Sequence, residues 1–474
     1  MAYNKEKASK INYLHLIQND TIRKYLSRCD RKKFPLQEDI HKCNIPINNI
    51  KNKHKVPLEY IIAVDGGYQE VCIDENFPSS KLCYYNIGIV NTKIKELESL
   101  EKDKIINPNL INKIEENSQI FGFVIPMQNI CLQEQDFTDT VRKTIFEIFA
   151  NNALSLEKLF KNHKDKPLES RQSTEKDSFI NTIKWLVFKE YENSDSFIEF
   201  ACPQCKAMQR FTKQTQNYTD EKNDFIVCNK CGEAIYITDC FDLHTLVDEI
   251  NGATLIQSYI MSVFEIVLML SMFRFFFENN ALYWLERILF IKDGPLALFS
   301  RLDDFVFKIV RPFLQFLYEK SLQDGKSYTN IVGLDKSGMF VEHFLHIESK
   351  ISENSLILPN LDYMRKYITG NNASVFGENT YFGIKIFVKK DDNLSFLLDL
   401  AVPFSRNIQY KDYIKNPSIE DFLALKAILE VLCKLKCDLY AKSFIPIAMI
   451  NKLVSLSNVP SKKILTLFSQ DVLR

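Results

Sequence analysis

The chain has 474 residues, of which 46% are apolar and 25% are charged, as in ordinary globular proteins large enough for two or three structural units. Lys plus Arg and Asp plus Glu both number 60, and this zero net charge neither favours nor excludes nucleic-acid binding, because a local basic groove can hide in a neutral total. The polar N-terminus lacks the apolar stretch of a secretory signal, so the twelve cysteines are expected to be metal ligands or free thiols in the reducing cytoplasm.

Helices and strands are predicted to alternate along the first part of the chain. Residues 1–56 are polar, rich in Lys and Arg, and have apolar residues at helical spacing, which predicts a helical segment. Residues 57–195 are expected to form the first part of a core that also contains a helical region. Its strands are predicted from about Tyr60, from about Cys83 and near 121–125, because apolar and β-branched residues cluster there.

Residues 196–241 form a separate unit with two Cys-x-x-Cys pairs, Cys202/Cys205 and Cys228/Cys231. Each pair places two thiolates on one tight turn, and four thiolates at this spacing suit a tetrahedral Zn²⁺ ion. The flanking apolar segments are typical of a zinc ribbon. Because four cysteines close the coordination sphere, this site is expected to be structural, and the catalytic centre must lie elsewhere.

Residues 242–474 are predicted to complete the core and to end in helices. A long apolar helix is expected from about Ala253 to Asn279. It is long enough to cross a membrane, but charges such as Glu265 and Arg274 are costly in lipid, so we predict a buried core helix and no membrane contact. Strands scattered among long helices, with pairs of consecutive strands, predict an α/β fold with a mixed sheet flanked by helices.

Two segments, YIIAVDGG and RILFIKDG, are the strongest candidates for catalytic chemistry. Each is an apolar run that predicts a buried strand, followed by Asp-Gly, at Asp65 and at Asp293. Glycine permits a tight turn, so each Asp is expected at the end of its strand. Two carboxylates on neighbouring strands of one sheet can hold divalent metal ions, which drive phosphodiester cleavage.

Five segments together resemble the NurA-domain nucleases. The resemblance covers roughly residues 58–90 and 255–470, and the four-cysteine unit lies between these stretches as an insertion. The matching segments are, in chain order, IIAVDGG, ILFIKDGPLALF, NIVGLDKSGMFVEHF, VFGENTYFGIKIFV and FIPIAMINKLVSL.

This resemblance implies a ribonuclease-H-like core, a ring-shaped homodimer and DNA cleavage that depends on Mn²⁺ or Mg²⁺. It also implies exonuclease and single-strand endonuclease activity in partnership with a HerA-like hexameric ATPase, in DNA end processing or defence. The chain has no phosphate-binding G-x-x-x-x-G-K-[ST] pattern of its own, so any ATP-driven step would come from such a partner.

The resemblance also assigns roles to individual residues. Asp65 and Asp293 fall on the metal-binding aspartates, and Lys336 falls on a lysine expected to meet a phosphate. The family uses a glutamate on the helix that precedes the strand ending at Asp293. We favour Glu265 for this role, because burial of a carboxylate in an apolar helix is unfavourable unless the carboxylate has a function. Glu278 and Glu286 have the pattern of helix-end and surface residues, and His343 is as consistent with a structural role as with a functional one.

The C-terminal motif departs from the family pattern. Asn451 stands where the family has a catalytic His, and Ser443 stands where it has a Tyr. Asn can coordinate a metal through its carbonyl oxygen but cannot act as a general base. Tyr440 is a possible substitute, although core packing is the simpler interpretation.

Two functions of different classes therefore remain open, a metal-dependent nuclease and a catalytically reduced DNA-binding or scaffold subunit. The Asn at position 451 favours the scaffold, whereas the two Asp-Gly strands and the buried Glu265 favour the nuclease. A zinc-ribbon transcription factor is disfavoured because no second DNA-recognition motif is present.

Overall fold

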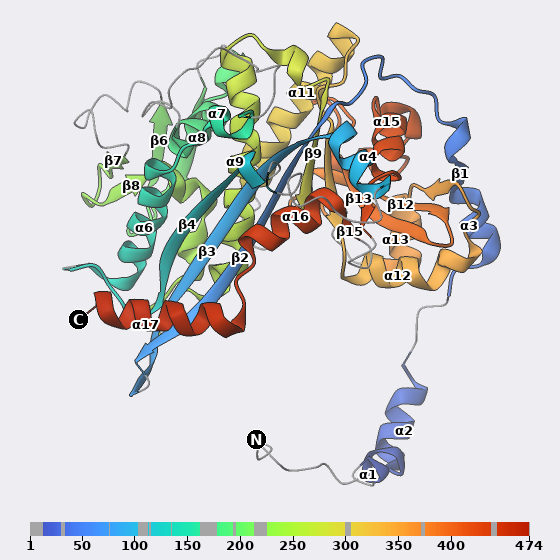
Figure 1. Ribbon diagram of the computed structural model, residues 1–474. Coiled ribbons are helices and arrows are strands. Elements are labelled where there is room, and N and C mark those ends of the chain that lie inside the picture. The colour runs from blue at the N-terminus through green and yellow to red at the C-terminus, as the bar shows by residue number, and fades with distance from the viewer. Residues whose placement is uncertain are drawn as a thin grey trace.

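The computed structural model describes residues 13–29, 34–74, 76–102, 112, 115–133, 135–161, 178–192, 196–212, 225–298, 305–370, 375–437 and 443–473. Its centre is a nine-stranded mixed sheet with the order β1-β11-β12-β13-β10-β9-β2-β3-β4 (Figure 1). The strands are β1 (Asn44–Pro46), β2 (Tyr60–Asp74), β3 (Phe77–Lys93), β4 (Ser118–Gln128), β9 (Ile288–Asp293), β10 (Ile331–Asp335), β11 (Ser355–Ile357), β12 (Gly383–Asp391) and β13 (Leu394–Ala401).

Five of these strands form the core of the fold. β2, β3 and β4 pair antiparallel, whereas β9 pairs parallel with both β2 and β10. This is the ribonuclease-H-like mixed sheet that the sequence predicted, and it is extended on one side by β13, β12, β11 and β1. Helices flank it, as expected for an α/β protein: α3 (Gln37–Cys43), α4 (Ile94–Lys102), α6 (Phe137–Asn151), α7 (Leu156–Leu159), α8 (Phe179–Val187), α9 (Gln257–Glu278), α11 (Arg311–Asp324), α12 (Met339–Ile347), α13 (Leu361–Met364), α14 (Tyr410–Tyr413), α15 (Leu425–Leu432), α16 (Ile445–Val454) and α17 (Lys463–Val472). Two further helices, α1 (Leu14–Ile17) and α2 (Asp20–Ser27), precede them in the chain.

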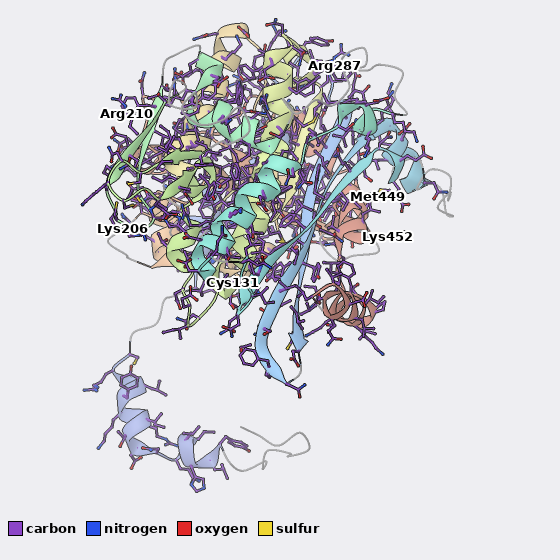
Figure 2. The ribbon with its side chains drawn as sticks, turned by 90° about the vertical axis from the view of Figure 1, so that its left-hand side faces the viewer. Cys131, Lys206, Arg210, Arg287, Met449 and Lys452 are labelled. Atoms are coloured by element: carbon purple, nitrogen blue, oxygen red, sulfur yellow. The ribbon has the colours of Figure 1, made fainter. Side chains whose placement is uncertain are left out.

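The N-terminal segment contains the predicted helices, but it also contributes β1 to the edge of the main sheet, which the helical pattern did not show. Helices α1 and α2 have no buried residues and stand apart from the body of the protein (Figures 1 and 2). Their apolar positions are therefore not part of the core, although their spacing is helical.

Helix α9 lies across the sheet as a core helix. It is apolar on all sides, and such helices are stable only when they are surrounded by protein or lipid. The segment Thr254–Glu278 is long and apolar enough to cross a membrane, and 78% of its most apolar window is buried within the protein. This burial agrees with the predicted core helix.

The position of Asp65 in its strand differs from the prediction. β2 does not end there but continues to Asp74, so Gly66 and Gly67 lie inside a long strand and form no turn. Their role is to admit neighbouring helices. A Cβ on Gly66 would lie 2.8 Å from Met261 in α9, and a Cβ on Gly67 would lie 2.8 Å from the carbonyl oxygen of Val454 in α16. Alternate residues of a strand face opposite ways, so α9 and α16 cover opposite faces of β2.

The four-cysteine unit is built from two short hairpins, which is compatible with the expected zinc ribbon. Its strands are β5 (Phe197–Ala201), β6 (Met208–Thr212), β7 (Phe225–Val227) and β8 (Ala234–Tyr236). A further two-stranded hairpin, β14 (Lys436–Cys437) with β15 (Ser443–Phe444), precedes α16. The predicted strand ending at Asp293 is present, and β12 and β13 form a hairpin, one of the expected pairs of consecutive strands.

Candidate active site

Asp65 and Asp293 come together because their strands are neighbours. β2 and β9 are parallel, and Val64 is paired with Lys292, so the next residue on each strand, Asp65 and Asp293, occupies adjacent positions. Asp65 is buried, and its Oδ1 accepts a hydrogen bond of 2.8 Å from the backbone N–H of Gly66. Asp293 is the last residue of β9, and Gly294 turns the chain away with a φ of 84°. The predicted pairing of two strand-borne carboxylates is thus present in the structure.

Glu265 approaches β2 from helix α9, on the face of the strand opposite to α16, and its charge is close enough to raise the pKa of Asp65. Its Oε1 would lie only 2.9 Å from a Cβ on Gly66, so a side chain at position 66 would displace it. Only 2% of Glu265 is exposed, and its Oε2 forms an ion pair of 2.7 Å with Nζ of Lys292. Glu278 and Glu286, the other candidates on this part of the chain, instead pair with Arg274 and Lys326.

Lys336 and Asn451 complete the cluster. Nζ of Lys336 lies 2.7 Å from Oδ2 of Asp293, and Nδ2 of Asn451 donates a hydrogen bond of 2.9 Å to Oδ2 of Asp65. Asn451 is carried by α16, one helical turn from the residue that contacts Gly67. Asp65, Asp293, Lys336 and Asn451 are therefore joined by strand pairing and by these contacts, whereas Glu265 is linked to them through Lys292.

The electrostatics of the cluster favour a divalent cation. Burial and then the nearby charges of Asp293 and Glu265 raise the pKa of Asp65 to about 7. Burial likewise raises the pKa of Glu265, although Lys292 opposes the effect. Carboxylate oxygens are the ligands that Mg²⁺ and Mn²⁺ prefer, and a bound cation would favour the ionised form of all three acids. The donor set therefore fits such an ion.

Lys292 was not singled out in the sequence, although a signal was present. It interrupts the apolar strand ILFIKD, and a buried lysine requires an anionic partner. The structure supplies Glu265 as that partner and also the backbone oxygen of Asp293, which accepts a hydrogen bond of 2.9 Å from Nζ. Lys292 thus orients two of the three acidic residues.

His343 does not take part in this cluster. It is buried on α12, where its Nε2 lies 3.0 Å from the hydroxyl of Tyr363 and its ring packs against Phe387. Burial lowers the pKa of His343 to about 4, so the imidazole is neutral near pH 7. These contacts support the structural interpretation. Tyr440 lies outside the described residues.

The four predicted metal-binding cysteines also come together. Their Sγ atoms all lie within 4.8 Å of one another, and the Cys202–Cys231 and Cys205–Cys228 pairs are each 3.6 Å apart. Four sulfurs arranged tetrahedrally at about 2.3 Å from a zinc ion are about 3.8 Å apart. The cluster therefore has the size of a Cys₄ zinc site.

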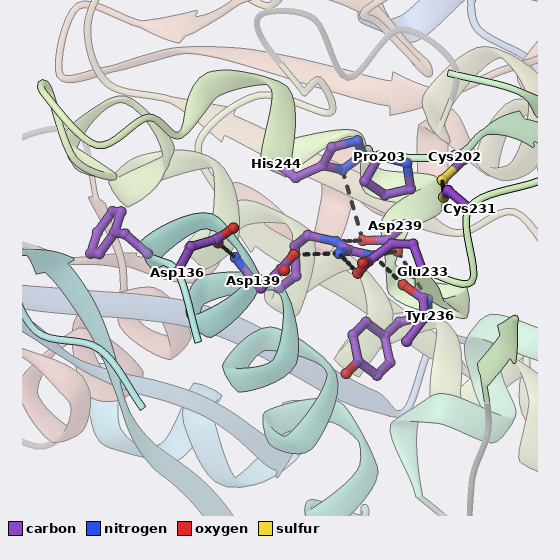
Figure 3. Close-up of polar contacts among 12 residues, drawn as sticks. Asp136, Asp139, Cys202, Pro203, Cys231, Glu233, Tyr236, Asp239 and His244 are labelled. Carbon is purple, nitrogen blue, oxygen red and sulfur yellow. Dashed lines mark hydrogen bonds and ion pairs between the residues drawn. The ribbon is translucent and has the colours of Figure 1, made fainter. Parts of the chain in front are cut away.

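A buried arginine joins this cysteine unit to helix α6. Arg142 of α6 forms ion pairs with Asp139 (2.7 Å), Glu233 (2.9 Å) and Asp239 (2.8 Å). Figure 3 shows these contacts converging beside Cys202 and Cys231. The carbonyl oxygen of Glu233 accepts a hydrogen bond of 2.8 Å from the N–H of Cys228, so the arginine is linked directly to the second cysteine turn.

The hydrogen bond from Asn451 to Asp65 leads to a test of the altered C-terminal motif. Asn451→Ala removes the donor but leaves the three carboxylates, so we expect the DNA cleavage that the resemblance implies to fall by about 10–100-fold, the usual cost of losing a partner of a metal ligand. Cleavage rates at saturating Mn²⁺ measure this effect. Asn451→Asp, which cannot donate this bond, should be impaired as well; unchanged rates in both variants would show that Asn451 has no part in catalysis.

Comparison with known proteins gives one family match and one structural match. Residues 59–456 match the NurA domain. No curated protein matches the chain. Among solved structures, a match is found to the NurA nuclease from Sulfolobus solfataricus, with 10% identity, a TM-score of 0.29, and coverage of 98% of this chain and 95% of that chain. Because the domain match spans most of the sequence and contains all five clustered residues, this chain belongs to the NurA domain family.

Proposed function

We propose that this protein is a metal-dependent deoxyribonuclease that hydrolyses phosphodiester bonds as an exonuclease and single-strand endonuclease. The observation that carries the proposal is the adjacency of Asp65 and Asp293 on neighbouring parallel strands, with Glu265 close enough that its charge helps to raise the pKa of Asp65. A protein without catalytic activity gains no stability from neighbouring buried carboxylates, because their repulsion and burial both oppose folding.

The three acids would hold Mn²⁺ or Mg²⁺. When bound, such an ion supplies an activated water molecule and stabilises the leaving oxygen of the phosphodiester. The protein's own contribution is to fix the carboxylates: Lys292 orients Glu265, Asn451 orients Asp65, and Lys336 lies against Asp293. Because its side chain is 36% exposed, Lys336 is also accessible to a phosphate of the DNA.

The cysteine unit is proposed to hold a structural zinc ion. Lys206 and Arg210 lie on the outer side of this unit (Figure 2), where a cationic side chain can meet the DNA backbone. We further propose that the protein acts as a homodimer in the cytoplasm with a HerA-like ATPase, which would supply ATP-driven DNA movement. Repair and defence against foreign DNA are both compatible with this role.

The test is cleavage of end-labelled single- and double-stranded DNA with Mn²⁺. We expect cleavage by the wild type, loss of cleavage on adding EDTA, and loss in Asp293→Ala. Glu278→Ala is the matched control, because Glu278 is also acidic but pairs with Arg274 away from the cluster. If the wild type binds DNA without cutting it, also in the presence of the ATPase, the non-catalytic scaffold is the correct function.

A further inference from the structure

A second buried charge cluster lies beside the candidate active site. Four residues occupy one row across four adjacent strands: Lys292 is paired with Gly333, Gly333 with Asp399, and Asp399 with Lys385. Residues in one row of a sheet face the same side. The charged side chains on this row are therefore neighbours on the face that Lys292 shares with Glu265.

The loop after Asp293 crosses this row. A Cβ on Gly333 would lie 2.6 Å from the carbonyl oxygen of Gly294 and 2.8 Å from the nitrogen of Leu296, so the loop rests directly on β10 at this glycine. The backbone N–H of Leu296 donates a hydrogen bond of 3.0 Å to Oδ2 of Asp399. The chain that leaves the metal-binding aspartate is thus held by a fully buried carboxylate.

Lys385 provides the countercharge for this carboxylate. Its Nζ donates a hydrogen bond of 3.0 Å to Oδ1 of Asp399 and one of 2.5 Å to Oδ2 of Asp335, and only 5% of the residue is exposed. Asp335 directly precedes Lys336, whose ammonium lies on Asp293. Lys385 therefore supports Asp293 from two directions, through the loop that follows it and through the end of the neighbouring strand.

We propose that Lys385 and Asp399 are positioning residues that fix Asp293 for metal binding and catalysis. This inference rests on the nuclease function proposed above. Neither residue touches Asp293 itself; both act through the backbone of Leu296 and through Asp335. Burying two aspartates that share one lysine costs desolvation free energy. Apolar residues of similar volume would stabilise the packing of strands β12 and β13 equally well or better. The charged carboxylate has a positioning role, because it accepts a strong, directional hydrogen bond from the backbone N–H of Leu296 in the loop.

Lys385→Met tests the proposal, with Lys389→Met as its matched control. Both lysines lie on β12, point to the same face, are 5% exposed and form ion pairs. Lys389, however, pairs with the exposed Asp392 and donates a hydrogen bond to the backbone oxygen of Glu348, not to residues 294–298, the described part of the loop. The measurements are Mn²⁺ affinity, from the electron paramagnetic resonance signal of free Mn²⁺, together with kcat and KM for single-stranded DNA and the thermal unfolding midpoint.

For Lys385→Met we expect Mn²⁺ affinity and kcat to fall by about 10–100-fold, with little change in KM for DNA. Lys389→Met should match the wild type in Mn²⁺ affinity and kcat. Asp399→Asn is a nearly isosteric second variant that keeps an acceptor for Leu296 but loses the charge. Asp399→Asn should also lower Mn²⁺ affinity and kcat, and it provides the test if Lys385→Met does not fold.

A Lys385→Met protein that unfolds at a lower temperature but binds Mn²⁺ and cleaves like the wild type would overturn the inference, because the cluster would then be only structural. The same holds if Lys385→Met and Lys389→Met lose metal affinity equally. In both cases the nuclease proposal survives. A wild type that neither binds Mn²⁺ nor cleaves DNA would reject both proposals.

Discussion

Asp65→Asn is expected to abolish Mn²⁺-dependent cleavage and, without metal, to make the protein more stable. The loss of cleavage follows from removing an anionic metal ligand, and it should exceed the roughly 10–100-fold effect of losing an outer partner. The gain in stability follows from the surroundings of the carboxylate. Asp65 is buried near Asp293 and Glu265, so ionisation of Asp65 is unfavourable in the folded protein when no cation is present.

The stability gain has a defined pH dependence. The folded-state pKa of Asp65 is about 7, above its ordinary value of 3.8, so between these values the folded protein binds more protons at this residue than the unfolded chain. The cost of ionised Asp65 is therefore fully present above about pH 7 and disappears as the pH falls toward 4. Asn carries no such cost, so in EDTA the unfolding midpoint of Asp65→Asn should exceed that of the wild type most clearly at pH 8.

Asp399→Asn provides the contrast for this measurement. Asp399 is also fully buried, but it has a lysine partner and a backbone donor. Its replacement should lower stability, because the buried ammonium of Lys385 loses a charged partner. Stabilisation by Asp65→Asn and destabilisation by Asp399→Asn would separate acids kept for chemistry from acids kept for positioning. If Asp65→Asn were destabilising in EDTA at pH 8, the carboxylate would be a structural residue.

Local patterns were sufficient to predict the elements that carry most of the site. The apolar run before Asp293, the spacing of the four cysteines and the alternation of helices and strands are all properties of short segments. The predicted strand at β9, the two small hairpins of the cysteine unit and the long core helix are present. The resemblance implied a glutamate on this helix, and the choice of Glu265 among the candidates needed only the observation that an acid interrupts an apolar helix.

The features that were missed depend on contacts between distant segments. Gly66 was interpreted as a turn residue, but it lies inside a strand because α9 packs against it, and the identity of a packing partner is not encoded locally. The three-residue strands β1 and β11 are too short to give a periodic pattern. The grouping of Lys385 with Asp399 and Asp335 depends on the register of three strands, which no single segment reveals.

Arg142→Met is expected to produce the largest loss of stability among the substitutions considered. The arginine side chain is 2% exposed and pairs with three carboxylates, of which Asp239 is buried as well. Removing one partner of a buried ion pair costs about 3–5 kcal/mol, because the remaining charges stay buried without compensation. The loss should be concentrated in the cysteine unit, since Glu233 and Asp239 both belong to the segment after its second cysteine turn.

Arg406→Met is the matched control for this prediction. Arg406 also pairs with two carboxylates, Glu192 and Glu319, but its side chain is 39% exposed. Solvent screens such pairs, so its replacement should cost about 1 kcal/mol or less. Urea unfolding followed by circular dichroism measures both values.

Release of zinc, the ion proposed for the cysteine unit, to a chelator provides a second measurement for Arg142→Met. Because Arg142 holds Glu233, and the carbonyl of Glu233 holds the N–H of Cys228, the loss of the arginine should loosen the second cysteine turn. We therefore expect metal release from Arg142→Met to be several-fold faster than from the wild type or Arg406→Met. Equal release rates in all three proteins would show that the cysteine unit holds its metal independently of helix α6.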